Sequence, residues 1–420
     1  MTPEVKQRIE QIRQGIVPEG YKKGKIGIVP IKWNEVPFST LFTSTSEYTD
    51  DLKQYPLYSL TIEDGITAKT ERYERSHLVK KENSYKVVRP NDYAYNPMNI
   101  RFGAVARHKG DIPVAVSGYY DIFTTVHESD LVFMDSFLTY GPMITYYNKV
   151  STGSLVEKQR VHFSDFLEFS LALPPLEERK KIAEILATQD KAIELQARKI
   201  EELKRFKKGC LEKLFPRKGQ KVPEKRFPGF TDDWEQRKVG DITIESTEYL
   251  TLDSGLPLFT SSRNGLLYQN EYRGNVTTNN KQTLFSVVPL GACTYRHMSD
   301  DDVFHLNINT IEKGLVSREY PVFCGTPNHD IVFIVQHINS SKAFRAFCAE
   351  QKMGGTRTRL YYKALCEFTM MVPSFAEQRR ISKFLLTIDH LITLHQRKLE
   401  EMKRQKKALM QLLLTGIVRI

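Results

Sequence analysis

The feature of the sequence that most constrains the fold is a stretch that occurs twice. Residues 174–215 and 373–414 align without a gap at a constant offset of 199 residues (373 − 174 = 199). An internal repeat of this kind indicates duplicated structural units. The matched pairs include Pro174/Pro373, Ile182/Ile381, Leu186/Leu385, Asp190/Asp389, Ile193/Ile392, Arg198/Arg397, Glu202/Glu401, Lys204/Lys403 and Leu214/Leu413.

Both copies have the apolar spacing of a long helix with a heptad seam. In the first copy the seam residues are Ile182, Leu186, Ile193, Ile200, Leu203, Cys210 and Leu214. In the second copy they are Ile381, Leu385, Ile388, Ile392, Leu399, Met402, Leu409 and Leu413. Polar residues interrupt both seams at equivalent places, Gln196 and Lys207 in one and His395 and Lys406 in the other. We expect helices of about 60 Å that pack together, although each could instead pack on its own domain.

A globular segment precedes each helix, so the whole chain is predicted to be a tandem duplication. The two tryptophans, Trp33 and Trp234, lie at nearly equal distances from the following helix (174 − 33 = 141 and 373 − 234 = 139). Few residues match inside the globular segments, which have therefore diverged further than the helices. The triplet Gly-Ile-Val occurs at residues 15–17 and again at 416–418, and predicts that the start of the chain packs near its end.

Each globular segment is interpreted as a small α+β domain with short strands between turn residues. A helix is expected at 341–352, and strands are expected at 84–90, 112–126, 130–134, 283–288, 320–323 and 330–338. The predicted divisions are an N-terminal helix and lead-in at 1–32, a first domain at 33–173, a first helix at 174–215, a linker at 216–229, a second domain at 230–372, and a second helix with the C-terminal tail at 373–420.

Composition narrows the classes of partner and compartment. The net charge of +11 suggests a polyanionic partner, either nucleic acid or an anionic surface. Five cysteines without CxxC spacing argue against a zinc ribbon or a disulfide framework and fit the reducing cytoplasm. The polar N-terminus does not resemble a signal peptide, and no apolar run approaches membrane-spanning length.

Motifs of catalysis are missing from the sequence. It contains no phosphate-binding loop, no glycine-rich dinucleotide fingerprint, no nucleophile elbow and no HExxH. The stretch 96–99 only faintly resembles an adenine methyltransferase motif and is better explained as a turn. The three aspartates at 300–302 could bind a metal, but an acidic loop is the usual explanation. We therefore expect no catalytic residue, no metal site and no cofactor in this chain.

Polar loops that mix Arg or Lys with Asn, His or Tyr are the candidates for DNA contact. The strongest is 354–362, where two arginines follow a double glycine and suit bidentate contact with guanine edges or phosphates, although a solvated hairpin explains it equally well. The candidate DNA-binding residues are Lys69, Arg72, Arg75, Arg107, His108, Lys109, Lys158, Arg160, Arg263, Asn264, Asn279, Asn280, Lys281, Arg296, His297, Arg357 and Arg359.

Four stretches resemble the specificity subunits of type I restriction-modification systems. Two are the Pro-rich entries to the helices, at 173–179 and 372–378. The others are RFPGFTDDWEQRKVGDI at 226–242 and GGTRTRLYY at 354–362. The resemblance covers nearly the whole chain. The first half departs from the pattern, because STGSLVEKQR (151–160) replaces the double-glycine loop and WNEVPF (33–38) lacks the FPGF lead.

The resemblance implies two α+β target-recognition domains separated by two long helices that pack as an antiparallel coiled coil. Each domain would read one half of a bipartite double-stranded DNA target. The helices would set the spacer and dock two methyltransferase subunits, which bind S-adenosylmethionine, and restriction subunits would join and use ATP and Mg²⁺. The alternatives are a stand-alone DNA-binding or scaffold protein of the same architecture, and an enzyme with an unrecognised site.

Overall fold

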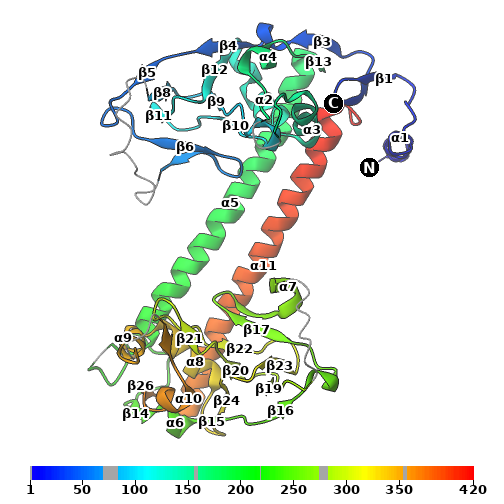
Figure 1. The fold of residues 1–420 in the computed structure, drawn as a ribbon. Helices are drawn as coiled ribbons and strands as arrows, with labels where there is room; N and C mark the ends of the chain where they lie inside the picture. Colours follow the sequence, from blue (N-terminus) through cyan, green and yellow to red (C-terminus); the bar gives the residue numbers. More distant parts are fainter. Residues whose placement is uncertain (1, 70–83, 156–158, 218, 274–281, 353–356) are drawn as a thin grey trace. The chain divides into compact units, whose positions relative to one another are not determined.

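The computed structural model describes the whole chain except residues 1, 70–83, 156–158, 218, 274–281 and 353–356 (Figure 1). The described residues divide into two compact units. Unit 1 contains residues 1–197 and 397–420, and unit 2 contains residues 198–396. Two long helices, α5 (Leu176–Leu214) and α11 (Phe375–Leu414), each contribute one part to unit 1 and the other part to unit 2.

Both long helices begin two residues after the first proline of their Pro-rich entry. Proline disfavours helical backbone in the residue before it, so each entry stays extended until α5 starts at Leu176 and α11 at Phe375. The first turns carry Glu177, Glu178 and Glu377, which interact favourably with the positive end of the helix dipole. The repeated sequence therefore forms two helices of nearly equal length, as predicted.

Unit 1 is built from short antiparallel strands and small helices. Its helices besides the long ones are α1 (Pro3–Arg13), α2 (Leu131–Phe137), α3 (Gly141–Val150) and α4 (Phe163–Leu167). Its strands are β1 (Tyr21–Gly24), β2 (Gly27–Pro30), β3 (Asn34–Pro37), β4 (Phe42–Thr45), β5 (Tyr48–Thr49), β6 (Tyr58–Thr61), β7 (Gly65–Ala68), β8 (Tyr85–Val88), β9 (Tyr93–Tyr95), β10 (Val105–Arg107), β11 (Val114–Ser117), β12 (Asp121–Thr125) and β13 (Ser170–Leu173).

Unit 2 has a matching set of elements. Its shorter helices are α6 (Val239–Ile242), α7 (Gln269–Arg273), α8 (Ile331–Ser340), α9 (Lys342–Glu350) and α10 (Tyr362–Leu365). Its strands are β14 (Glu235–Lys238), β15 (Thr243–Glu245), β16 (Tyr249–Leu250), β17 (Phe259–Ser262), β18 (Gly265–Tyr268), β19 (Phe285–Val288), β20 (Cys293–Thr294), β21 (Met298–Ser299), β22 (Asn307–Ile308), β23 (Gly314–Ser317), β24 (Val322–Gly325), β25 (Thr358–Arg359) and β26 (Thr369–Val372).

The strand order confirms that the globular segments are duplicates. The four-stranded sheet β10-β9-β12-β4 of unit 1 corresponds to β22-β20-β24-β15 of unit 2. The three-stranded sheets β11-β8-β5 and β23-β19-β16 correspond in the same way, as do the pairs β6-β7 and β17-β18 and the pairs β3-β13 and β14-β26. Two α+β domains of common topology, joined by long helices, are the fold class expected from the sequence.

The strand predictions for 130–134 and 330–338 were wrong, because both segments are helical. Asp330 caps α8 by accepting hydrogen bonds from the backbone N–H groups of Val332 and Phe333. Asp130 precedes α2 at the equivalent position. Both helices are apolar and mostly buried, and a short apolar run rich in β-branched residues does not separate a buried strand from a buried helix. At 330–338 the capping Asp330 was the signal of a helix, whereas Asp130 makes no capping hydrogen bond to α2.

In each unit a part of α5 packs against a part of α11. In unit 1, Ile182 and Leu186 of α5 share a core with Leu413 and Leu414 of α11 and with a cluster of aromatic side chains. In unit 2, Leu214 of α5 shares a core with residues of α11 that include Ile381, Leu385 and Ile388. Every predicted seam residue is buried or half-buried, which confirms the heptad prediction.

The lysines in the two seams form ion pairs between the helices. Lys207 Nζ lies 2.7 Å from Asp389 Oδ1 in unit 2, and Lys406 Nζ lies 2.5 Å from Asp190 Oδ1 in unit 1. The two pairs are equivalent under the 199-residue repeat, because 190 + 199 = 389 and 207 + 199 = 406. From Asp190 to Lys207 the chain runs forward along α5, whereas the partners of these residues run backward along α11, from Lys406 to Asp389. The paired helix segments are therefore antiparallel.

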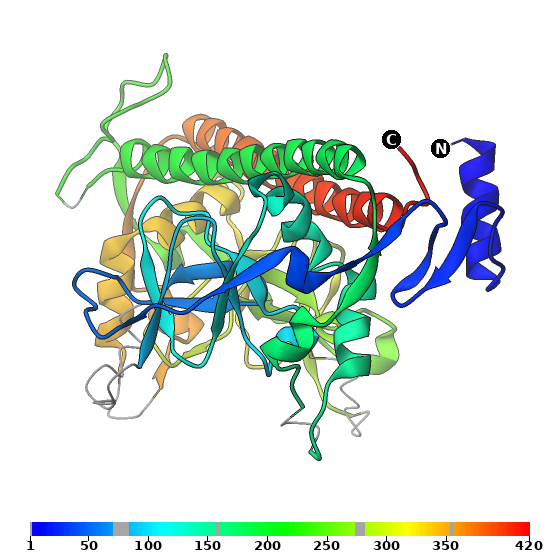
Figure 2. The same ribbon diagram turned by 90° about the horizontal axis from the view of Figure 1, so that it is seen from above.

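The two ends of the chain meet in unit 1, as the repeated Gly-Ile-Val triplet predicted (Figure 2). The Tyr21 hydroxyl donates a 2.6 Å hydrogen bond to the Gly416 carbonyl. Arg419 forms two hydrogen bonds with the buried carboxylate of Glu178, which also accepts one from the Trp33 indole. In unit 2 the equivalent carboxylate, Glu377 (178 + 199 = 377), is bound in the same way by Arg226.

Candidate nucleic-acid interface

A cleft of about 630 Å³ in unit 1 contains three of the predicted DNA-binding residues. Its walls are the β6–β7 hairpin with its turn at 61–65, strand β10 with the turn at 108–112, and helix α2. Arg107, His108 and Lys109 line it, together with Tyr93 and Asp135. The sequence placed the three basic residues in a loop, whereas the structure fixes Arg107 at the end of a strand.

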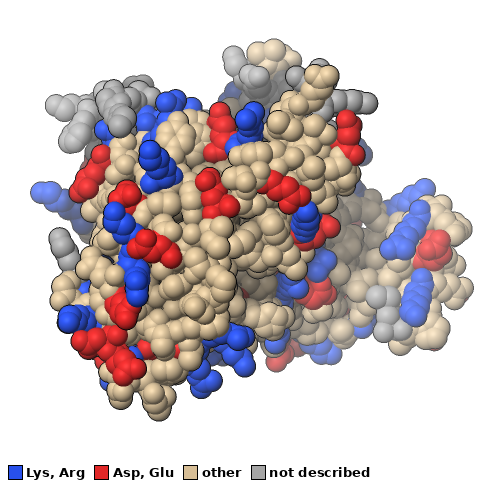
Figure 3. Space-filling view, turned by 90° about the horizontal axis from the view of Figure 1, so that it is seen from below, with Lys and Arg blue, Asp and Glu red and all other residues tan. Residues whose placement is uncertain are grey.

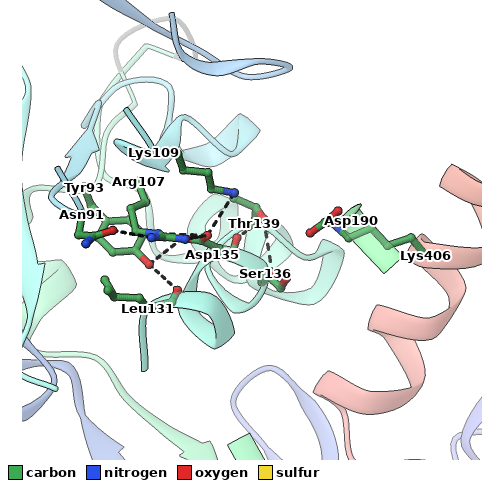
Figure 4. Close-up of polar contacts among 10 residues, drawn as sticks. All are labelled: Asn91, Tyr93, Arg107, Lys109, Leu131, Asp135, Ser136, Thr139, Asp190 and Lys406. Atoms are coloured by element: carbon green, nitrogen blue, oxygen red, sulfur yellow. Dashed lines mark hydrogen bonds and ion pairs between the residues drawn. The ribbon is translucent and has the colours of Figure 1, made fainter. Parts of the chain in front are cut away.

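Asp135 is the centre of a polar network in this cleft (Figure 4). Arg107 donates from Nε to Asp135 Oδ1 at 2.9 Å and from Nη2 to Oδ2 at 2.8 Å. Lys109 Nζ lies 3.2 Å from Asp135 Oδ2, and the Tyr93 hydroxyl donates to Oδ1 at 2.8 Å. Arg107 also donates from Nη1 to Asn91 Oδ1 at 2.6 Å. The guanidinium is therefore held in one plane by two neighbours.

Local backbone geometry positions the partners of Arg107. Asn91 lies in the left-handed region at φ +72°, in the turn between β8 and β9, and asparagine tolerates that conformation better than most residues. Backbone hydrogen bonds from Asn91 to His108 and from His108 to Asp92 hold this turn against the end of β10. Asp135 projects from α2, and Arg107 pairs with Tyr93 across the antiparallel ladder of β10 and β9.

The electrostatics of the network favour a charged Arg107. Burial lowers the pKa of Arg107, but the hydrogen bonds and charge of Asp135 outweigh that effect, so the pKa is raised. Burial raises the pKa of the Tyr93 hydroxyl, and the neighbouring Asp135 carboxylate raises it further. Tyr93 is therefore a neutral donor, and Arg107 and Asp135 form an ion pair with side chains only 14% and 15% exposed.

The remaining unit 1 candidates have other surroundings. His108 is buried, and its Nε2 lies 2.7 Å from the Ile112 carbonyl, so the ring braces the turn at 108–112. Arg160 is half-buried and forms a backbone bridge with Thr152. Lys69 is exposed just after β7. Arg72, Arg75 and Lys158 lie outside the described residues.

In unit 2 the acidic turn at 300–302 brings two candidate arginines together. Asp301 lies 2.6 Å from Arg263, and Asp300 lies 2.7 Å from Arg357. Asp302 accepts a hydrogen bond from the Thr358 hydroxyl. The three aspartates thus bind the β17–β18 turn and the start of β25, as an acidic loop would. Among the described residues, no group of three or more His, Cys, Asp or Glu side chains could hold a metal ion.

The other unit 2 candidates lie close to this turn in sequence or in the sheet. Arg359 is exposed in β25 and pairs with Met298 of β21, next to Arg296 and His297. His297 is buried and stacks on Tyr361 with ring centroids 5.4 Å apart. Burial lowers the pKa of His297, so its ring is less readily charged than an exposed histidine. Asn264 is exposed in the β17–β18 turn, and Asn279, Asn280 and Lys281 lie outside the described residues.

Sequence reasoning missed two groups of polar residues. Asn91, Tyr93 and Asp135 carry no motif, and only the fold brings them to Arg107. A hollow of about 820 Å³ on α11 in unit 2 is lined by Arg379, Arg380, Lys383 and His390, whose helical spacing could have indicated it.

On the face shown in Figure 3, Lys and Arg side chains alternate with Asp and Glu and do not form one continuous basic surface.

Comparison with known proteins gives consistent matches. The family described as the type I restriction modification DNA specificity domain matches residues 135–205 and again residues 317–404. A Methanocaldococcus jannaschii protein assigned as the type I restriction enzyme MjaX specificity subunit is 24% identical over 445 residues, which cover 99% of this chain and 93% of that protein. The MjaVIII specificity subunit of the same organism is 24% identical over 278 residues, 61% of this chain and 63% of that protein.

Two solved structures share the fold. The type I restriction-modification S subunit from M. genitalium aligns with a TM-score of 0.57 at 13% identity, over 94% of this chain and 99% of that one. A chain from a study of complex assembly and conformational transition of the type I R-M system aligns with a TM-score of 0.52 at 16% identity, over 93% and 99%. Among the described residues, no helix is long and apolar enough to cross a membrane.

Proposed function

We infer that this chain, in which the type I restriction modification DNA specificity domain occurs twice, is the specificity subunit of a type I restriction-modification system. Each of its two units reads one half of a bipartite DNA target. The proposal depends on one structural observation above all. Unit 1 and unit 2 have the same scaffold, but they present different side chains on it.

The common scaffold is visible in contacts that recur at the offset of the repeat. Glu178 and Glu377 each bind an arginine, and each seam lysine binds the aspartate of the other helix. The polar surface residues do not recur: Arg107 and Lys109 line the cleft of unit 1, whereas unit 2 offers Arg263 and Arg357 on an acidic turn. Base contacts specify sequence while backbone contacts position the protein, so two scaffolds with different polar loops suit two different half-sites.

We further propose the partners that such a subunit needs. Two methyltransferase subunits bind the chain and carry S-adenosylmethionine, and restriction subunits join them and use ATP and Mg²⁺. The chain itself supplies sequence recognition and no catalysis, which is supported by the lack of catalytic and nucleotide-binding motifs in the sequence. Because α5 and α11 each belong to both units, these helices are the elements that set the spacer between half-sites and dock the methyltransferases. We place the complex in the cytoplasm, where chromosomal DNA is accessible.

Coexpression with a methyltransferase subunit of the same restriction-modification system tests this function. The expected result is a complex that copurifies and that methylates one bipartite sequence in the host genome, with methylation lost when the chain is omitted. Methylation or cleavage of DNA by the purified chain alone would identify an enzyme instead. Specific DNA binding without association with any methyltransferase would identify a stand-alone DNA-binding protein.

A further inference from the structure

The Arg107–Asp135 network is specific to unit 1, and the fold does not require it. The backbone hydrogen bonds of the turn before β9 recur in unit 2, where Gly291 donates to Asn309 and Asn309 donates to Ala292. This pattern and the strand registers make Gly291, Cys293 and Ile308 the counterparts of Asn91, Tyr93 and Arg107. Val335 of α8 is the counterpart of Asp135 of α2, because both are five residues after the aspartate that precedes the helix.

Unit 2 packs apolar side chains where unit 1 has the ion pair. Cys293 and Val335 belong to the buried core of unit 2, and the half-buried Ile308 packs against it. Replacing a mostly buried ion pair by apolar residues is often neutral or stabilising, because removing two charges from water is costly. Stability alone therefore gives no reason for unit 1 to keep Arg107 and Asp135. A mostly buried charged pair in a cleft instead indicates a ligand-binding site.

Arg107 keeps donors for a ligand. Its bonds to Asp135 and Asn91 use Nε and one hydrogen on each Nη nitrogen. These bonds fix the plane of the guanidinium, and among the described residues neither Nη nitrogen has a further partner, so Nη hydrogens remain for a ligand. Arginine Nη groups can donate to two adjacent acceptors such as O6 and N7 of guanine, or two oxygens of a phosphate.

The rim of the cleft discriminates between these two ligands. Glu63 and Asp64 on the β6–β7 turn and Asp111 on the turn at 108–112 are exposed, line the cleft, and have no ion-pair partner among the described residues. Three carboxylates repel a phosphate group. They suit a base edge, because carboxylates accept hydrogen bonds from the cytosine amino group that lies beside guanine O6 in the major groove.

Two exposed isoleucines support contact with a macromolecule at this rim. Ile62 and Ile112 are 54% and 57% exposed and lie on the two turns that line the cleft. Neither contributes to the buried core of unit 1. Each can pack against a base or a sugar in a groove, where apolar contacts add to the hydrogen bonds that read a base pair.

We propose that the cleft of unit 1 reads a G·C base pair of its half-site, with Arg107 as the residue that contacts guanine and Asp135 as the residue that positions Arg107. This inference rests on the proposed function and names the base pair that unit 1 recognises. The rim carboxylates face the cytosine of the same pair.

The test is selection of binding sites from a randomised DNA duplex pool by the full-length chain in its methyltransferase complex. In Arg107→Lys the charge stays but the fork is lost, and in Arg107→Ile combined with Asp135→Val the cleft carries the residues of unit 2. Both are expected to lose preference at one G·C position of one half-site, by roughly 5- to 150-fold. The other half-site should be unchanged.

Three results would overturn the inference. One is an unchanged half-site in Arg107→Lys, a variant that keeps the positive charge beside Asp135 and is expected to fold even if the double variant does not. Another is a uniform loss of binding to all sequences with a smaller salt dependence, which identifies a phosphate contact. The third is relaxation at a position that is not G·C. Failure of the proposed function differs from all of these, because the wild-type chain would then select no bipartite sequence.

Discussion

His337 of α8 occupies the position that Phe137 of α2 has in unit 1, at an offset of 200 residues. Its ring is buried and stacks on Phe215 with centroids 4.6 Å apart, and Nδ1 has no partner among the described residues. Burial lowers the pKa of His337 to about 4 from its ordinary value of 6.5. His337 therefore fills the core of unit 2 as a neutral ring, at the position that Phe137 fills in unit 1.

This histidine makes unit 2 sensitive to acid. His337 binds a proton near pH 6.5 in the unfolded chain but only near pH 4 in the folded chain. The stability that the neutral ring of His337 contributes is therefore full above pH 6.5 and is lost as the pH falls towards 4. Between pH 7.5 and 5 the wild type should lose about 2 kcal/mol more than His337→Phe. Urea midpoints followed by tryptophan fluorescence measure the difference. Equal losses in the two proteins would show that His337 is not the group responsible.

At the scale of elements, the paired helix segments owe their register to more than apolar residues. Apolar seams alone tolerate shifted or reversed pairings, and polar residues in a seam are the usual means of fixing one of them. The Lys207–Asp389 and Lys406–Asp190 pairs satisfy each seam lysine only in the observed antiparallel register. We infer that these pairs select the register.

Charge reversal tests this selection. Lys207→Asp places two carboxylates opposite each other and should destabilise unit 2 by about 1–2 kcal/mol, and adding Asp389→Lys should restore most of the loss. The matched control is Lys204→Asp, because among the described residues Lys204 forms an ion pair with the exposed Glu201 of α5 and none with α11. Its effect should stay within about 0.5 kcal/mol. If the double variant were no more stable than the single one, the two residues would not be coupled.

The contact between the chain ends predicts different effects for the glycines of the two Gly-Ile-Val triplets. Both have positive φ, +76° at Gly15 and +68° at Gly416, so alanine is strained at either by about 1 kcal/mol. A Cβ on Gly15 meets nothing within 4 Å, whereas one on Gly416 would lie 2.5 Å from Pro30 Cγ and 2.9 Å from Trp33 Cζ2. Gly416→Ala should therefore cost about 2 kcal/mol more than Gly15→Ala in denaturant unfolding. Similar costs would mean that the tail does not pack on Trp33.

The sequence predicted elements better than it predicted contacts. Heptad spacing identified both long helices and their seams, because a period repeated over forty residues has few explanations. It could not identify the partners of Lys207 and Lys406, since those depend on how two distant segments align. The segments at 130–134 and 330–338 were misassigned because burial on all sides removes the periodicity that separates a helix from a strand.

At the scale of the whole molecule, duplication allowed the architecture to be predicted but left the site largely open. The sequence placed Arg107, His108 and Lys109 among seventeen candidates without distinguishing them. The fold distinguishes them, because Arg107 is clamped beside Asp135, His108 braces a turn, and Lys109 reaches the mouth of the cleft. Residues 28 positions apart, such as Arg107 and Asp135, carry no signal in one sequence. The contrast between Asp135 and Val335 becomes meaningful only when the two units are aligned.

The proposed function requires that the two units read two half-sites independently. Exchanging residues 230–372 for the corresponding segment of a relative with a different target, and then sequencing the methylated sites of the host genome, tests it most directly. If the units are independent, one half-site changes to that of the relative while the other stays as in the wild type. An intact, active complex in which both half-sites change together, or in which neither changes, would contradict it.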